Sequence, residues 1–287
     1  MAASTAALRG ITKQYKDFTL GPVDMTVPAG SIVGLIGENG AGKTTLLKIL
    51  CGVNRADDGT VDLLGGSPAD AATRAKIGVV FEDAFFYGSF TAAQVARSLA
   101  GMYGARWNAD SCFSAYLRRF GLDAGKKLKE YSRGMRLKLS LAAALAHDPE
   151  LLVLDEATAG LDPVVRGELL DLFLEFIQDE RHSIVMSSHI TADLEQIADS
   201  IAYLHNGQLL FQENKDDLLQ EYGVLHCGED VLTSLPAGLV VFTRRGAYGC
   251  ESLVRERRTV QELLPEAVCD AARLDDIMRF YSGRDAQ

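Results

Sequence analysis

One segment constrains the fold more than any other, the stretch Gly37–Thr44 with the sequence GENGAGKT. It satisfies the pattern G-x-x-x-x-G-K-[ST] in full. The apolar run Ser31–Ile36 before it predicts a strand, and the apolar spacing of Lys43–Leu50 predicts a helix after it. A strand, a glycine-rich loop and a helix in this order are typical of a phosphate-binding loop in an α/β protein. We therefore expect ATP or GTP to bind at this loop.

The residue types of the loop suit a triphosphate. Glycines let successive backbone N–H groups turn toward phosphate oxygens, and the positive end of the following helix adds to the attraction. Lys43 is expected to bridge the β- and γ-phosphates and to act in catalysis, and Thr44 to hold Mg²⁺. The nucleotide-binding set predicted here is Gly37, Glu38, Asn39, Gly40, Ala41, Gly42, Lys43, Thr44 and Thr45.

Two further apolar runs end in polar residues with chemical uses. Leu151–Leu154 is followed by Asp155 and Glu156, and Ser183–Met186 by a short polar segment that ends in His189. Ligands of open α/β sheets bind at the carboxyl ends of strands, so these residues are expected at one crevice. Asp155 is expected to hold Mg²⁺ through water, and Glu156 to act as the catalytic base on the attacking water. Taken alone, the first run is equally compatible with a core strand that ends in solvated acids.

The rest of the chain predicts helices and then a small mixed segment. Helical periodicity dominates about residues 85–147, and the sequence changes to short alternating runs from about Glu221. We expect a nucleotide-binding domain of residues 1–220, whose helical subdomain spans about 85–147, and a small α+β accessory domain of residues 221–287. Helices are expected at Ala92–Tyr103, Ala109–Phe120, Gly134–Ala146 and from Asp162-Pro163 to about Asp179. In the accessory domain we expect strands at Tyr222–Cys227, Leu239–Arg244 and Tyr248–Val254, followed by helices near Val260–Leu264 and Ala271–Tyr281.

Charge and hydropathy limit the classes of protein to which this chain can belong. The 287 residues hold 29 Lys+Arg against 39 Asp+Glu, a net charge of −10, which argues against a basic nucleic-acid binder. The longest apolar run is Leu141–Ala146, far below the roughly 20 residues that span a bilayer, and the N-terminus does not resemble a secretory signal. We expect a cytosolic location. The five cysteines are widely spaced and are expected to be reduced, buried residues.

Four further motifs resemble those of one family. Tyr131-Ser132-Arg133-Gly134-Met135 resembles the signature loop of ABC-transporter ATPases, usually Leu-Ser-Gly-Gly-Gln. Ala159–Asp162 resembles their D-loop, Ser188-His189 their H-loop, and Tyr15 the aromatic residue that stacks on adenine. Together with the phosphate loop these motifs cover about Leu8 to Gln220. The chain is identified as a member of the ABC ATPases, which implies an α/β P-loop NTPase fold with a helical subdomain, and ATP and Mg²⁺ as ligands.

The resemblance also implies roles and partners. His189 contacts the γ-phosphate, whereas Ser132, Arg133, Gly134 and Asp162 serve a nucleotide held by the opposite subunit. One chain then cannot complete a site, so the working unit is a head-to-tail homo- or heterodimer. Separate transmembrane permease subunits are expected, with this chain peripheral on the inner face of the cell membrane as the ATPase of an exporter and without nucleic acid. The transported substrate is not encoded here.

Some residues depart from the family pattern or leave alternatives open. Glu82 stands where most members have a glutamine, and a carboxylate can still reach Mg²⁺ through oxygen. Arg133 either adds a cationic contact across the interface or is simply exposed. Phe85, Phe86 and Tyr87 either line a permease-binding groove or belong to the helical core. For the whole chain, the alternatives are a soluble ABC ATPase acting on ribosomes or DNA, and a small-molecule kinase.

Overall fold

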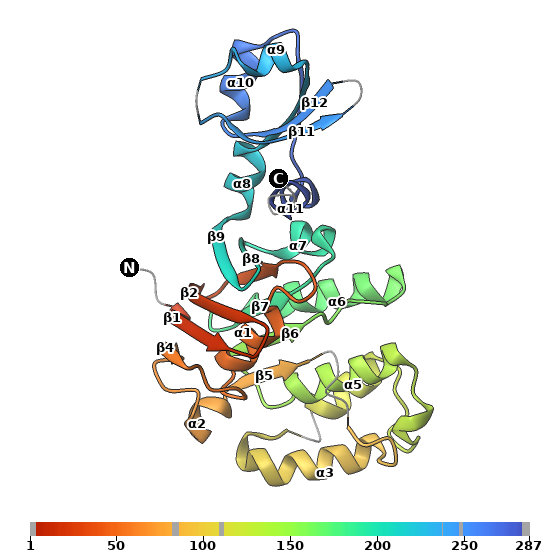
Figure 1. The fold of residues 1–287 in the computed structure, drawn as a ribbon. Coiled ribbons are helices and arrows are strands. Elements are labelled where there is room, and N and C mark those ends of the chain that lie inside the picture. The colour runs from red at the N-terminus through yellow and green to blue at the C-terminus, as the bar shows by residue number, and fades with distance from the viewer. Residues whose placement is uncertain (1–3, 82–85, 109–111, 237, 247–248, 283–287) are drawn as a thin grey trace. The chain divides into compact units, whose positions relative to one another are not determined.

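The computed structural model describes residues 4–81, 86–108, 112–236, 238–246 and 249–282 (Figure 1). Glu82 and Phe85 lie outside the described residues, as do residues 109–111 of one expected helix. The chain divides into two compact units, one of Met1–His189 with Ala202–Phe211 and the other of Ile190–Ile201 with Gln212–Gln287. The second unit therefore takes in more than the expected accessory domain, and a functional boundary at residue 220 stays a prediction.

A six-stranded sheet carries the expected phosphate loop. Four of its strands, β5, β6, β7 and β3, are parallel, and every residue of β3, β6 and β7 is buried. Strands buried on both faces read as continuous apolar runs, which is why the sequence revealed these three. The strand order is β5 (Ile77–Val80), β6 (Leu151–Asp155), β7 (Ser183–Ser187), β3 (Ile32–Ile36), β8 (Ser200–His205) and β9 (Gln208–Asn214).

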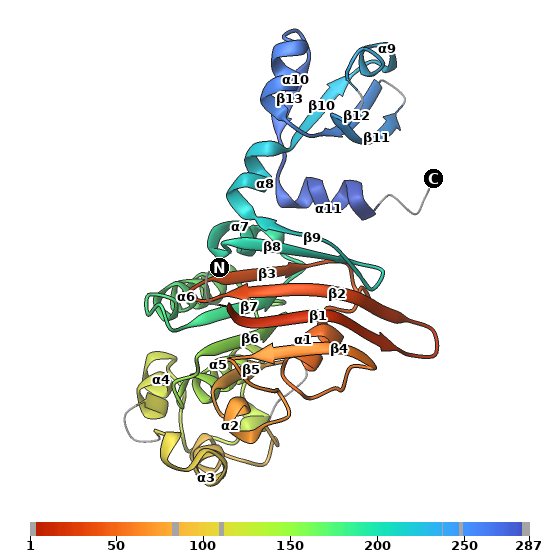
Figure 2. The ribbon, with the colours of Figure 1, turned by 90° about the vertical axis from the view of Figure 1, so that its left-hand side faces the viewer.

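A three-stranded antiparallel sheet belongs to the same unit and was not predicted. Its order is β2 (Thr19–Pro28), β1 (Ser4–Gln14) and β4 (Asp58–Leu63), which lie side by side in Figure 2. Buried and exposed residues alternate along much of β2, so alternation rather than an apolar run was the available signal. Helix α1 (Lys43–Leu50) shares one buried core with this sheet and with β3, β6 and β7. The predicted α/β P-loop class is therefore confirmed.

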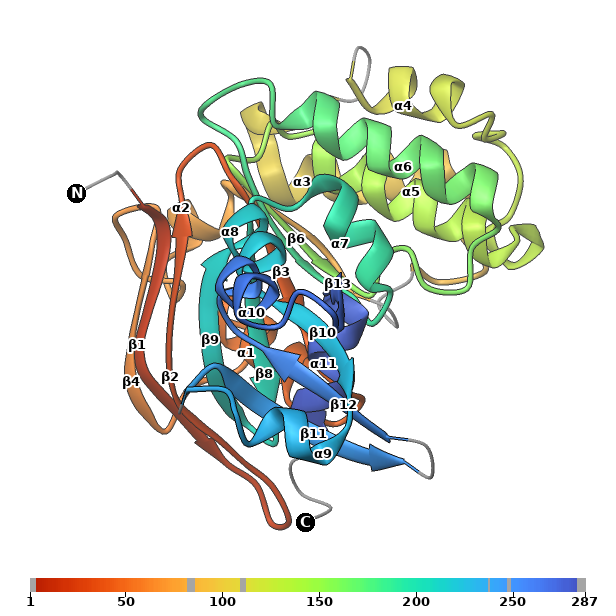
Figure 3. The ribbon, with the colours of Figure 1, turned by 90° about the horizontal axis from the view of Figure 1, so that it is seen from above.

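The helical subdomain has a core of its own. α3 (Ala92–Tyr103), α4 (Ser114–Arg119) and α5 (Arg133–Leu145) gather at one end of the first unit (Figure 1 and Figure 3), around buried aromatic side chains such as Trp107 and Phe113. Shorter elements complete this unit: α2 (Ala71–Arg74) and the 3-10 turns η1 (Gly104–Arg106) and η3 (Leu128–Glu130).

Helix α6 (Pro163–Phe176) begins where the sequence predicts. The Asp162 carboxylate accepts hydrogen bonds from the backbone N–H groups of Val164 and Val165 at 3.2 and 3.1 Å. An acidic N-cap followed by proline at the first helical position is a well-defined helix start, because proline needs no partner for a missing N–H there.

The second unit is mixed α and β. Its antiparallel sheet has the order β11 (Val240–Gly246), β12 (Gly249–Val254), β10 (Gly223–Cys227) and β13 (Val268–Ala271). The last helix begins at Leu274 rather than at the expected Ala271, because Val268–Ala271 pairs with β10 as an edge strand. Its helices are α7 (Thr191–Ile197), α8 (Lys215–Glu221), α9 (Glu229–Leu232), α10 (Arg257–Leu263) and α11 (Leu274–Ser282).

None of the helices in the described part of the chain is long and apolar enough to cross a membrane.

The packing of α1 generates a stability prediction. Leu47 is fully buried in the core that α1 shares with both sheets, so Leu47→Ala leaves a cavity and lowers the free energy of unfolding by about 2–5 kcal/mol. Val53 is 62% exposed, and Val53→Ala is the matched control with a change below about 0.5 kcal/mol. Denaturant unfolding followed by circular dichroism measures both. Equal effects of the two variants would contradict this account of the core.

Candidate active site

The phosphate loop joins the carboxyl end of β3 to α1, and two of its glycines are required by geometry. Gly42 caps α1 with a φ of 107°, a left-handed conformation that side chains rarely adopt, and a Cβ there would press on the ring of Phe18. A Cβ on Gly37 would overlap the carbonyl oxygen of Leu204 in β8. The loop therefore lies tightly on the sheet, and its shape depends on bare backbone at both positions.

A cavity of about 240 Å³ opens at this loop. Most of its lining residues come from the predicted set, and Glu156 joins them from the end of β6. Ala41 is buried and lies outside this lining. The lining consists of Phe18, Glu38, Asn39, Gly40, Gly42, Lys43, Thr44, Thr45 and Glu156.

Phe18 is a lining residue that the sequence analysis missed. Its carbonyl oxygen accepts a hydrogen bond from the N–H of Tyr15 at 2.8 Å, and the two ring centroids lie 6.5 Å apart. Tyr15 itself is 42% exposed, as an aromatic surface for stacking has to be. The sequence signal that could have identified Phe18 is its position as a second aromatic residue three positions after Tyr15.

The Lys43 side chain folds back over its own loop. Its Nζ donates hydrogen bonds to the carbonyl oxygens of Gly37 at 2.7 Å and Glu38 at 3.2 Å, and it lies 3.4 Å from Oε1 of Glu156. Lys43 is buried, so its positive charge is compensated by these oxygens rather than by bulk water. A triphosphate in the cavity offers the same ammonium group stronger anionic partners.

Thr44, Asp155 and Ser187 form a chain of hydroxyl-to-carboxylate hydrogen bonds. Thr44 Oγ1 donates to Asp155 Oδ2 at 2.8 Å, and Ser187 Oγ donates to Asp155 Oδ1 at 2.7 Å. The structure therefore brings together two of the three residues predicted to hold Mg²⁺, Thr44 and Asp155. Their hard oxygen atoms are the ligand type that Mg²⁺ prefers, so the donor set fits this ion.

Glu156 leaves β6 in a strained conformation. Its φ is 52°, in the left-handed region that costs a residue with a side chain about 1–3 kcal/mol. Its backbone N–H donates both to the carbonyl oxygen and to Oγ of Ser187, each at 3.1 Å. These two bonds hold the backbone in this conformation, and the carboxylate reaches the lining of the phosphate-loop cavity.

The two oxygens of the Glu156 carboxylate have different surroundings. Oε2 accepts a hydrogen bond from the backbone N–H of His189 at 3.3 Å and lies 2.6 Å from His189 Nδ1. Oε1 is buried beside Lys43 and accepts no hydrogen bond from the residues that the structure describes. One oxygen is thus held by His189, whereas the other faces the ammonium group of Lys43.

Ser187 is a second residue that the sequence analysis missed. It is fully buried, and its one hydroxyl connects the carboxylate of Asp155 with the backbone of Glu156. The signal was present, because Ser187 is the first polar residue after the apolar run that precedes His189. Only the parallel register, which sets Asp155 opposite Ser187, reveals what it contacts.

The signature-like residues lie apart from this cavity. Ser132 caps α5 and accepts a hydrogen bond from the N–H of Met135 at 3.2 Å, and Gly134 follows in the first turn. Ser132 and Arg133 are exposed, and the Arg133 guanidinium lies close to Gly160 of the D-loop-like segment. The carboxylate of Asp162 is used as the cap of α6. Neither Ser132 nor Gly134 lines the phosphate-loop cavity.

The aromatic residues after Glu82 were expected either in a permease-binding groove or in the helical core, and the two that the structure describes differ in burial. Phe86 is partly buried against the core of the helical subdomain. Tyr87 is 77% exposed, with its ring centroid 5.7 Å from that of Phe90. Phe86 therefore packs on the core of the helical subdomain, whereas Tyr87 is a surface residue.

Comparison with known proteins gives a consistent result. A family model described as ABC transporter matches residues 20–159. The bacitracin transport ATP-binding protein BcrA of Enterococcus faecalis is 36% identical over 72% of this chain and 68% of its own length. The lantibiotic transport ATP-binding protein SrtF of Streptococcus pyogenes is 33% identical over 73% of this chain and 90% of its own length. An uncharacterized ABC transporter ATP-binding protein of Synechocystis is 38% identical, and this chain spans 58% of its length.

Solved structures agree with the fold. A structure described as the ATP binding subunit of an ABC transporter has a TM-score of 0.69 at 29% identity, over 75% of this chain and 92% of that one. A dimeric ATP-binding cassette bound to ADP and Pi has a TM-score of 0.66 at 23% identity, over 73% of this chain and 98% of that one, and supports the fold alone.

The position of Ser187 generates a prediction about metal dependence. Ser187→Ala removes one hydroxyl donor from Asp155, and we expect the Mg²⁺ concentration that half-saturates ATP hydrolysis to rise about 10- to 100-fold, as for other groups that orient metal ligands. A titration of the hydrolysis rate with Mg²⁺ measures the change.

Ser183→Ala is the matched control. Ser183 is also fully buried and hydrogen-bonded, at the opposite end of β7, where its Oγ lies 2.7 Å from Thr5 Oγ1. This variant loses similar packing and leaves the Mg²⁺ dependence at the parent value. The same Mg²⁺ dependence in both variants would show that Ser187 does not position Asp155.

Proposed function

This chain belongs to the family of ABC transporter ATP-binding proteins, and from that premise we propose that it binds and hydrolyses ATP as the separate energy-coupling subunit of an exporter. The observation that carries the proposal is the Glu156 carboxylate at the phosphate-loop cavity, with one oxygen held by His189 and the other beside Lys43. The relatives named for bacitracin and lantibiotic transport support the exporter class.

In the proposed reaction the chain's own residues position a water molecule and the triphosphate. Backbone N–H groups of the loop and Lys43 hold the phosphates, while Glu156 Oε1 accepts the proton of the attacking water. His189 keeps the carboxylate oriented through Oε2. Tyr15 is proposed to stack on adenine, and Phe18 to cover the adjacent part of the cavity. Because most of the barrier is electrostatic, preformed positions of these groups are what accelerate hydrolysis.

We propose Thr44 and Asp155 as holders of Mg²⁺, with Glu82 as a further oxygen ligand. The side-chain oxygens of Thr44 and Asp155 are joined by a hydrogen bond of 2.8 Å. When bound, the ion neutralises charge on the phosphate oxygens. Ser187 keeps Asp155 in position through a hydrogen bond to its other carboxylate oxygen, Oδ1.

The proposal includes a head-to-tail dimer. Ser132 is exposed at the start of α5, where helix N-terminal N–H groups form an anion receptor, and it does not line the cavity of its own chain. We infer that Ser132, Arg133, Gly134 and Asp162 serve the ATP of the opposite subunit. ATP then favours the closed dimer, and hydrolysis removes that preference. The partner is a second cassette, identical or not.

Separate transmembrane permease subunits convert dimer closure into export in this proposal. The chain then works as a peripheral subunit at the inner face of the cell membrane, and the permease selects the substrate. Tyr87, an exposed residue five positions after Glu82, is proposed as part of the permease contact.

The catalytic assignment is tested by Glu156→Gln. The amide keeps the size of the side chain and cannot accept a proton, so hydrolysis falls by about 100- to 10,000-fold while ATP binding persists. Because the ATP-bound dimer then no longer dissociates through hydrolysis, it accumulates, and light scattering detects it in the presence of ATP. Glu180→Gln, at an exposed position away from the cavity, serves as the control. Turnover of ATP by Glu156→Gln at the parent rate would refute the assignment of the base.

The partner assignment has its own test. The tagged chain, extracted from membranes with a mild detergent, is expected to carry a protein with several membrane spans, identified by mass spectrometry. Recovery with ribosomes or DNA and without a membrane protein would instead favour the soluble alternative.

A further inference from the structure

A pair of cysteines belongs to the second unit, whereas the candidate nucleotide site belongs to the first. Cys227 ends β10, and Cys250 lies near the start of β12. The antiparallel register sets these two residues directly opposite one another. All five cysteines of the chain are outside disulfides, so both groups are thiols.

The backbone already has the spacing of a disulfide. Residues directly opposite in an antiparallel pair have Cα atoms about 4.5–5.5 Å apart. Disulfides join Cα atoms that are about 4.4–6.8 Å apart. The Cα spacing expected of Cys227 and Cys250 therefore lies within the range that a disulfide requires.

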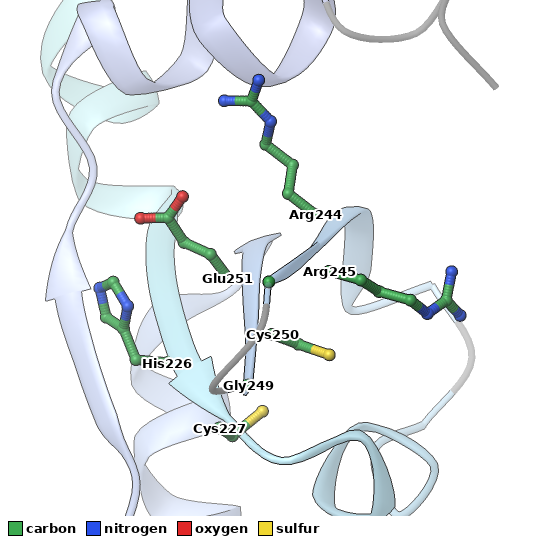
Figure 4. A pocket seen from close by; sticks show the side chains of 8 residues that line it. His226, Cys227, Arg244, Arg245, Gly249, Cys250 and Glu251 are labelled. Atoms are coloured by element: carbon green, nitrogen blue, oxygen red, sulfur yellow. The ribbon is translucent and has the colours of Figure 1, made fainter.

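Both side chains also lie on the same face of the sheet. Figure 4 shows the two sulfur atoms on one side of the strands, whereas His226 and Glu251, the next opposed pair, point to the other side. Such alternation follows from the pleat of antiparallel strands. The thiols thus share one local environment.

The pair is accessible to small molecules. A cavity of about 620 Å³ borders both cysteines together with residues from both faces of the sheet: His226, Arg244, Arg245, Gly246, Gly249 and Glu251 (Figure 4). Cys227 is partly exposed, whereas Cys250 is 7% exposed. Cys227 is therefore the more accessible thiol of the pair.

The other cysteines have no such arrangement. Burial, with a smaller contribution from Asp155, raises the pKa of Cys51 to about 12, so its thiol is inert. Cys269 lies in the same sheet, but its partner across the strands is Leu225 rather than a cysteine. Burial also raises the pKa of Cys227, with smaller contributions from Cys250 and Asp230, so less of this thiol is ionised at neutral pH than in a free cysteine.

We propose that Cys227 and Cys250 form a reversible dithiol site for low-molecular-weight disulfides. The Cys227 thiolate attacks one sulfur of the small disulfide, forming a mixed disulfide and releasing one thiol. The Cys250 thiolate then attacks Cys227 Sγ, forming the intramolecular bond and releasing the second thiol. The two protein sulfurs are oxidised, the small disulfide is reduced by two electrons, and the two thiol protons end on the released thiols.

The bond closes the chain between residues 227 and 250 into a covalent loop. That segment carries α9 and β11, the edge strand next to β12. Cross-linking two strands that are already paired limits the ways in which this segment can unfold. The site is thus a covalent restraint on the second unit that responds to the ratio of disulfide to thiol.

The test uses the full chain and glutathione as the probe. The reduced protein is equilibrated at rising ratios of oxidised to reduced glutathione and then unfolded in denaturant with N-ethylmaleimide, so that buried free thiols are blocked too, and intact masses and peptides are measured. We expect blocked thiols to fall from five to three, so that the intact mass loses two maleimide adducts and the polypeptide itself about 2 Da, the two thiol hydrogens. We also expect a Cys227–Cys250 cross-linked peptide and reversal by dithiothreitol.

Variants separate this pair from the other cysteines. Cys269→Ser still loses two thiols, because its cysteine is outside the pair. Cys250→Ser stops at the mixed disulfide with glutathione on Cys227, since no second thiol lies opposite to release it. Five blocked thiols at every ratio, a cross-link through Cys269, or a glutathione adduct that persists on Cys227 of the parent protein would overturn the proposal.

Discussion

The hydrogen bonds that converge on Asp155 connect the parts of the proposed active site. Thr44 brings the start of α1, and Ser187 brings the end of β7, so three separate segments meet at one carboxylate. This meeting depends on the parallel register of β3, β6 and β7, which sets Ser187 opposite both Leu35 and Asp155. A shift of one residue would turn these side chains to the other face of the sheet.

The strain at Glu156 follows from the same arrangement. A β-strand that simply continued would carry the carboxylate past the loop, whereas the left-handed turn brings it to the cavity. Ser187 stabilises that turn through its backbone and its side chain, and His189 then fixes one carboxylate oxygen. Strain held in place by neighbouring hydrogen bonds is a common way to preorganise a catalytic group.

The two units of the chain differ in the groups that they bury and expose. In the first unit, Asp155 and Ser187 are buried at the carboxyl ends of their strands and the capped start of α5 is exposed, which suits a site completed by a second cassette. In the second unit, the small core around Leu225, Val254 and Val260 supports a sheet in which two thiols stand opposite each other. That pairing is independent of the nucleotide site and has a chemistry of its own.

The sequence by itself determined the phosphate loop, the three buried strands and the helix start at Asp162, because close-range patterns of glycine, proline and apolar residues specify local structure. It left the antiparallel sheet, β13, and the contacts of Phe18 and Ser187 undetermined. Those features, like the opposed Cys227 and Cys250, depend on strand order and register, which join residues distant in the chain. Only packing of the whole unit selects one register among several that local patterns allow.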